Sequence, residues 1–107
     1  MSIDEFLVLF RELSVGQKKT MCDDEIRIVD SDEFICCPIT YVCKRQTGVE
    51  YAQHLYSNAA QRLGLTIEDA SIIAEASDNV FEEEHLWLRQ QLLDVVFEDS
   101  SFHYLFY

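Results

Sequence analysis

The residues best suited to metal or redox chemistry in this chain are its four cysteines, Cys22, Cys36, Cys37 and Cys43. They lack the paired C-x-x-C spacing with which one turn presents two thiolates to a tetrahedral zinc ion. Adjacent Cys36 and Cys37 would point to opposite faces of a strand. We therefore expect reduced, buried thiols that pack as small hydrophobic side chains, hold no metal and form no disulfide.

The histidines and one acidic run match known ligand patterns no better. The three histidines, at positions 54, 85 and 103, are not spaced as in the H-E-x-x-H motif. We expect His54, His85 and His103 each to be a partly buried structural residue. Asp30-Ser31-Asp32 could begin a calcium loop. However, Ile35 stands at the sixth position, where such a loop needs Gly, and Tyr41 at the twelfth, where it needs Glu. We expect this run to form a turn with solvated carboxylates.

Motifs for nucleophilic catalysis and phosphate binding are missing as well. The sequence has no G-x-S-x-G, P-loop or dinucleotide-binding pattern, and its three glycines, at positions 16, 48 and 64, are too scattered to form one. Nothing singles out a catalytic pair among the 20 carboxylates. We therefore expect no enzymatic activity and no cofactor, with a metal-dependent enzyme as the less favoured alternative.

Charge is the strongest functional signal in the sequence. Acidic residues outnumber basic ones by 20 to 8, which gives a net charge of −12. Residues 1–33 carry a net −5 and residues 68–107 a net −9, whereas residues 34–67 carry +2. Such a field repels nucleic acid and anionic membranes and attracts cationic protein surfaces. We therefore expect a basic protein partner, with no direct binding of nucleic acid or membrane.

The last helix expected from the sequence places its one tryptophan among carboxylates. At 100° per residue, one stripe faces the core: Phe81, His85, Leu88, Leu92, Val95 and Val96. The candidate partner-binding residues fall together on the far side: Glu83, Trp87, Asp94 and Glu98. Either Trp87 covers a loop or the hairpin, or it anchors a basic partner, because Trp is a common hot-spot residue at interfaces.

A second apolar stripe on this helix, formed by Leu86, Leu93 and Phe97, leaves two arrangements open. The helix is sandwiched in the core, or the stripe pairs with another subunit. The aromatic tail 102–107 raises the same question, because its rings must dock on the domain or on a second copy. A homodimer through either surface therefore stays open.

The elements that must position these residues are marked by helix caps. Ser2 and Glu5 form a capping box, and an alternating pattern over residues 25–36 favours a hairpin. Pro38 suits the first position of a short helix through Cys43, and Gly48 suits its stop. Apolar residues at helical spacing predict a further helix from Ala52 to Gly64. Thr66 and Asn79 are each predicted to start another helix. We predict a mainly α (α+β) fold: four to five short helices packed on one small β-hairpin, in a single domain spanning 1–107.

The location of the protein is constrained by what the chain lacks. Its first residues are acidic where a secretory signal would be basic, and no apolar run approaches the roughly 20 residues needed to span a bilayer. We expect a soluble, cytoplasmic protein.

Four short strings resemble a pattern found in small uncharacterised bacterial and phage proteins. They are Cys37-Pro38-Ile39-Thr40-Tyr41-Val42-Cys43, Thr47-Gly48, Leu63-Gly64-Leu65 and Ile72-Ile73-Ala74-Glu75-Ala76-Ser77-Asp78, and the match covers roughly residues 36–79. That family has no assigned activity, so the resemblance implies architecture only: Pro38, Gly48, Gly64 and Asp78 mark turns and caps. The short, acidic composition is also similar to that of phage anti-CRISPR-type inhibitors.

Together these observations favour an acidic protein-binding inhibitor, encoded by a phage or mobile element, that blocks a basic nucleic-acid-binding surface of a host defence protein. The alternative is a structural or regulatory interaction domain without nucleic-acid mimicry, in which the acidity serves only solubility.

Overall fold

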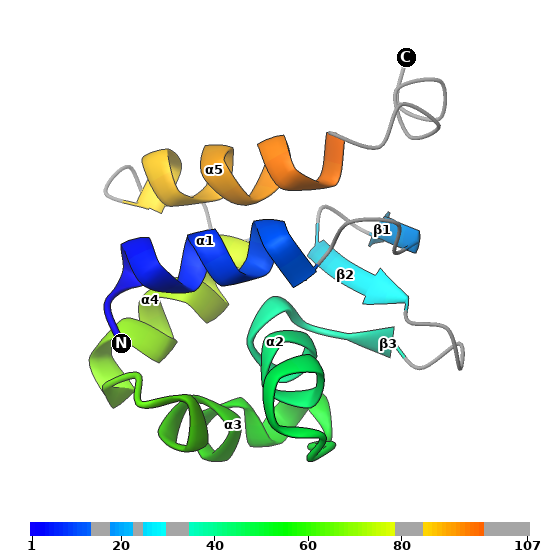
Figure 1. Ribbon diagram of the computed structural model, residues 1–107. Coiled ribbons are helices and arrows are strands. Elements are labelled where there is room, and N and C mark those ends of the chain that lie inside the picture. Colours follow the sequence, from blue (N-terminus) through cyan, green and yellow to red (C-terminus); the bar gives the residue numbers. More distant parts are fainter. Residues whose placement is uncertain (14–17, 23–24, 30–34, 79–84, 98–107) are drawn as a thin grey trace.

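Helices dominate the computed structural model, which describes residues 1–13, 18–22, 25–29, 35–78 and 85–97 (Figure 1). The described α-helices are α1 (Ile3–Leu13), α2 (Pro38–Thr47), α3 (Tyr56–Leu63), α4 (Ile67–Ser77) and α5 (Leu86–Phe97). One turn of 3₁₀-helix, η1 (Gln53–Leu55), leads into α3. The expectation of a mainly helical fold is confirmed.

The strands form a small antiparallel sheet in the order β1 (Lys18–Cys22), β2 (Glu25–Val29) and β3 (Ile35–Cys36). β2 pairs with β3 so that Ile28 lies opposite Cys36. Along β2, Ile26 and Ile28 are buried and their neighbours are half-buried, which is the alternation of a strand with one face on the core. β1 was not predicted, because Lys18-Lys19-Thr20-Met21-Cys22 shows no such alternation. The turn expected at residues 30–32 lies outside the described residues.

Most helix ends follow from the capping residues identified in the sequence. The Ser2 N–H donates to Glu5 Oε1 at 3.2 Å and the Glu5 N–H donates to Ser2 Oγ at 3.1 Å, so the capping box opens α1. Gly48 and Gly64 end α2 and α3 with φ of 80° and 85°, a conformation that glycine adopts without a steric cost. α2 continues past the predicted end at Cys43, because its stop signal is Gly48.

The helix start predicted at Thr66 is confirmed. The Asp69 N–H donates to Thr66 Oγ1 at 3.1 Å, which caps α4, and Ala70 and Ile73 are buried. Ile67, in contrast, is 75% exposed. As the first residue of α4 it lies beyond the turns that contact the core.

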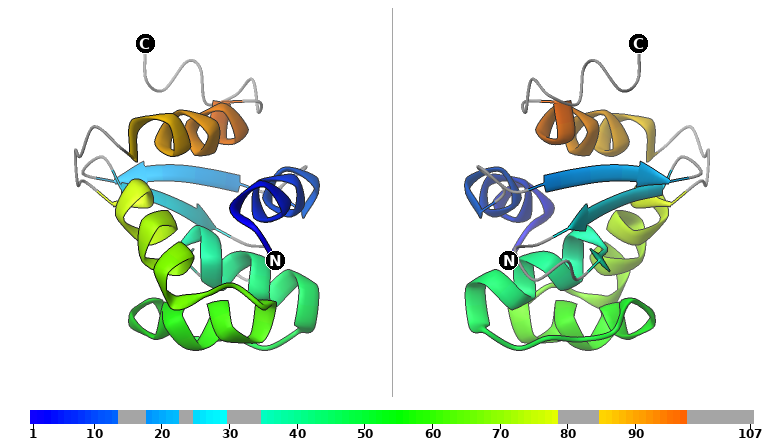
Figure 2. Two further views of the ribbon diagram at one scale, coloured as in Figure 1. Left: turned by 90° about the vertical axis from the view of Figure 1, so that its left-hand side faces the viewer. Right: turned by 90° about the vertical axis from the view of Figure 1, so that its right-hand side faces the viewer.

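The core is built from all parts of the fold. Phe6 and Phe10 of α1 stack with ring centroids 6.2 Å apart, and Phe10 meets Tyr41 of α2 edge to face at 6.4 Å. Tyr41 is fully buried and its hydroxyl donates to the Leu13 carbonyl, which joins α2 to the end of α1. Figure 2 shows the sheet with α5 on one side and α2, α3 and α4 on the other, while α1 lies beside it.

Candidate functional site

Helix α5 presents two chemically different sides. His85 just before it and four residues within it are buried: Leu88, Arg89, Leu92 and Val95. The predicted core stripe is therefore confirmed at His85, Leu88, Leu92 and Val95, while Phe81 and the side chain of Val96 lie outside the described residues. The opposite side is exposed, and we call Leu86, Trp87, Gln90 and Asp94 the α5 face.

Two large apolar side chains occupy the first turn of the α5 face. Trp87 is 58% exposed and Leu86 is 50% exposed. Of the two interpretations of Trp87, burial beneath a loop or the hairpin is thus not what the structure shows. Whether Trp87 binds a partner stays a prediction.

The polar end of the α5 face lies two turns further along the helix. The Gln90 Nε2–H donates to Asp94 Oδ1 at 2.9 Å, and Asp94 is exposed. Seven residues of helix separate Trp87 from Asp94, which is about 10 Å at 1.5 Å per residue. The structure therefore brings together two of the four predicted site residues, and the other two, Glu83 and Glu98, lie outside the described part of the chain.

The second apolar stripe does not form one continuous surface. Leu93 is half-buried and packs against the core, whereas Leu86 is exposed. The side chain of Phe97 and the tail 102–107 lie outside the described residues. Among the described residues of this stripe, Leu86 is the exposed one and belongs to the α5 face, and a homodimer through the stripe or the tail stays a prediction.

Buried polar groups fix α5 to α4. Arg89 Nη1 donates to the carbonyls of Ala76 and Asp78, at 2.9 and 2.8 Å. The last carbonyls of a helix have no partner within it, so Arg89 acts as a cap for α4 supplied by α5. His85 Nε2 lies 3.5 Å from Glu75 Oε2 of α4. These contacts fix the position of α5 relative to α4.

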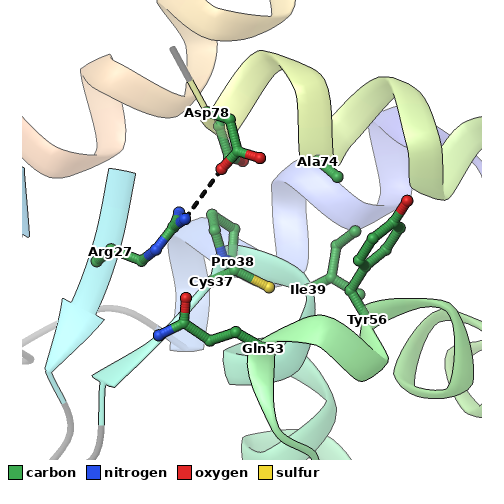
Figure 3. Close-up of a pocket in the computed structure, with 9 residues that line it drawn as sticks. Arg27, Cys37, Pro38, Ile39, Gln53, Tyr56, Ala74 and Asp78 are labelled. Atoms are coloured by element: carbon green, nitrogen blue, oxygen red, sulfur yellow. Dashed lines mark hydrogen bonds and ion pairs between the residues drawn. The ribbon is translucent and has the colours of Figure 1, made fainter. Parts of the chain in front are cut away.

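The interior offers a small cavity between β2, α2 and α4 (Figure 3). Its volume is about 50 Å³, and Arg27, Cys37, Gln53 and Asp78 are among the residues that line it. Arg27 Nη2 donates to Asp78 Oδ1 at 3.0 Å and to a Glu25 oxygen at 3.1 Å, so its charge is already paired. Ligand pockets usually measure about 300–1,000 Å³. This cavity has room for water molecules, and its ion pair serves to join the sheet to α4.

The predicted burial of the cysteines and histidines is confirmed for some residues and wrong for one. Cys36, Cys37 and Cys43 are buried free thiols, as expected, and Cys37 Sγ accepts from the Thr40 N–H at 3.5 Å at the start of α2. His85 is buried as expected, but His54 is exposed on η1, so its prediction as a partly buried residue was wrong. The side chains of Cys22 and His103 lie outside the described part. Within the described part, no three His, Cys, Asp or Glu side chains gather as metal ligands would.

Charge is divided unevenly between the described elements and the segments that join or follow them. The described residues carry all eight Lys and Arg and ten carboxylates. The other ten carboxylates lie at 23–24, 30–33, 82–84 and 98–99, in segments without a Lys or Arg. The described residues therefore carry a net charge near zero, and the acidic runs 82–84 and 98–99 flank α5 in the sequence.

A search with the sequence and structure found no matching protein family, curated protein or solved structure. No helix in the described ranges is both long and apolar enough to cross a membrane.

Proposed function

We propose that this protein is an acidic, non-enzymatic inhibitor that binds a basic nucleic-acid-binding surface of another protein through its α5 face. The observation that carries the proposal is an exposed Trp87–Leu86 pair on a helix whose flanking segments hold Glu82-Glu83-Glu84 and Glu98-Asp99. Interface hot spots combine a large apolar anchor with a polar rim. The proposed site of action is the cytoplasm.

The mechanism is steric and electrostatic. Carboxylates take the positions of phosphates and accept charge-assisted hydrogen bonds from Arg and Lys of the partner. Trp87 and Leu86 fill an apolar depression between those cations and supply contact area. Nucleic acid is then excluded because its binding surface is covered and its positive charge is neutralised. Long-range attraction between the net charge of −12 on this chain and a basic partner surface speeds association.

The proposal is tested by capture followed by competition. The tagged protein is incubated with nuclease-treated lysate at low and high salt, and recovered proteins are identified by mass spectrometry. Each recovered protein is then mixed with labelled nucleic acid, and fluorescence anisotropy is followed as the untagged chain is added. Stoichiometric release of nucleic acid from a basic partner supports inhibition. Partners that keep their nucleic acid while bound to the chain contradict it and favour the interaction domain without mimicry.

A charge-matched pair of variants locates the surface. The test variant carries Glu83→Lys, Asp94→Lys and Glu98→Lys. The control reverses three exposed carboxylates on α1 and α4, at Asp4, Glu12 and Glu68. Both variants change the net charge by the same amount, so slower association by the test variant alone assigns binding to the α5 face. Equal slowing in both would mean that only total charge matters.

A further inference from the structure

The surface of α3 carries no carboxylate, a property that it shares with α2. Residues 51–66 contain neither Asp nor Glu, in a chain with 20 of them. The exposed residues of α3 are Ser57, Asn58, Gln61 and Arg62. Figures 1 and 2 place α3 at the opposite end of the molecule from α5, so this surface is separate from the α5 face.

Arg62 is held in place on this surface by a tyrosine. Its Nε–H donates to Tyr51 Oη at 3.1 Å, and Tyr51 is half-buried in the segment between α2 and η1. This hydrogen bond uses Nε, and the two Nη groups keep the fork geometry that pairs with a carboxylate. The guanidinium is charged at any physiological pH, and the hydrogen bond to Tyr51 raises the pKa of Arg62 further. Because the hydrogen bond to Tyr51 already restricts the Arg62 side chain, less conformational entropy is lost when a ligand binds.

Arg62 also differs from the paired cations of the fold. Arg27 contacts two carboxylates, and Lys44 Nζ lies 2.8 Å from a Glu50 oxygen. No carboxylate of the described residues lies within ion-pair distance of Arg62, and its one hydrogen bond there goes to Tyr51. Its charge is therefore available to an external anion.

The space beside Arg62 is a shallow hollow of about 380 Å³, lined by Tyr51, Asn58, Gln61 and Arg62. The two amide side chains offer both donors and acceptors, and the guanidinium offers donors only. A molecule that fits this set carries an anion next to amide-like or hydroxyl groups. One cation balances a carboxylate, which bears one charge, better than a phosphate dianion.

We propose that this hollow binds a carboxylate carried by a polar small molecule or by the end of a peptide. Arg62 binds the carboxylate through its Nη groups, and Asn58 and Gln61 hydrogen-bond the adjacent polar group. Tyr51 is a positioning residue that acts through Arg62. The site is independent of the proposed inhibitor function.

The test is an NMR titration of the full chain at constant ionic strength, which follows the Arg62 Nε–H and the side-chain amides of Asn58 and Gln61. The probes are N-acetyl-glycyl-glycine, its C-terminal amide, sodium acetate and inorganic phosphate. Saturable shifts with the acetyl dipeptide, and shifts at least fivefold weaker with its amide, are expected. Tighter binding of the dipeptide than of acetate assigns a peptide end, and equal binding assigns a small carboxylate.

Two variants and a matched control decide the roles. Arg62→Gln should abolish saturation, and Tyr51→Phe should weaken binding several-fold while the Arg62 Nε–H resonance moves in the free protein. Arg45→Gln removes an exposed guanidinium of α2 that does not line the hollow and should leave binding unchanged. Shifts that never saturate, equal losses in the Arg45 and Arg62 variants, or phosphate binding as tight as that of the dipeptide would overturn the proposal.

Discussion

Replacement of Trp87 by alanine tests whether this side chain is a surface anchor for a partner or a residue of the core. Trp87 is 58% exposed, so 42% of its surface is covered in the folded protein. A fully buried aromatic hides about 150–250 Å², so this share is about 60–105 Å². At 25 cal/mol per Å² its loss costs about 1.5–2.6 kcal/mol as an upper bound. The methyl group that remains and the better helix propensity of Ala reduce this to about 1 kcal/mol.

Binding should respond more strongly than folding. If Trp87 is a hot spot, Trp87→Ala weakens partner binding by about 2 kcal/mol or more, which is about 30-fold in Kd. Thermal unfolding followed by circular dichroism should show a midpoint only a few degrees lower, because 1 kcal/mol corresponds to about 4–8 °C in a domain of about this size. Leu92→Ala is the matched core control on the same helix, fully buried, and should cost about 2–5 kcal/mol.

The fluorescence of the free protein gives an independent reading, because Trp87 is the one tryptophan in the chain. We expect red-shifted emission that quenchers reach readily. Caesium should quench more strongly than iodide, because acidic surroundings concentrate cations. Blue-shifted emission that resists quenching, together with a folding loss of about 3–5 kcal/mol in Trp87→Ala, would refute the assignment of Trp87 to the surface.

Three further changes test other parts of the reasoning. The triple reversal of Glu83, Asp94 and Glu98 to Lys should slow partner association and flatten its salt dependence in stopped-flow kinetics, while unchanged kinetics in a folded variant would rule out this surface. Neither EDTA nor a reductant should shift the thermal midpoint, since the cysteines are expected to hold no metal and no disulfide; about one zinc per chain by elemental analysis would contradict this. Gly48→Ala should lower the free energy of unfolding by about 1 kcal/mol in denaturant titrations, because φ is 80° at this position and the added Cβ would meet no neighbouring atom. A much larger loss would mean that more than backbone strain is involved.

The positions of the helices could be predicted because their signals are local. Ser2 with Glu5, Gly48, Gly64 and Thr66 each act on backbone groups within a few residues, so their effect is visible in the sequence. β1 could not be predicted in this way. The backbone N–H and C=O groups of β1 are paired with those of β2, which is a contact that the sequence of β1 does not encode locally. The residues Lys18-Lys19-Thr20 show no alternating pattern that would indicate a strand.

The candidate sites were predictable to a different degree. The 100° periodicity of α5 placed Trp87 on the side of the helix away from the core stripe, because a regular helix fixes which residues share a side. It did not decide whether a loop or the hairpin covers Trp87. It could not separate Leu86 from Leu93, which share a side but lie at different distances from the core. The contact between Arg62 and Tyr51 spans an irregular segment and η1, whose path no periodicity describes.

The cap that Arg89 supplies to α4 makes the two helices dependent on each other when they open. If α5 detaches locally, the carbonyls of Ala76 and Asp78 lose their donor, and the final turn of α4 frays with it. Asp78 also holds Arg27 of β2, so the disturbance reaches the sheet. The cooperative opening unit therefore extends from α5 through the end of α4 to β2. Hydrogen exchange should show these amides gaining protection together when a partner clamps α5.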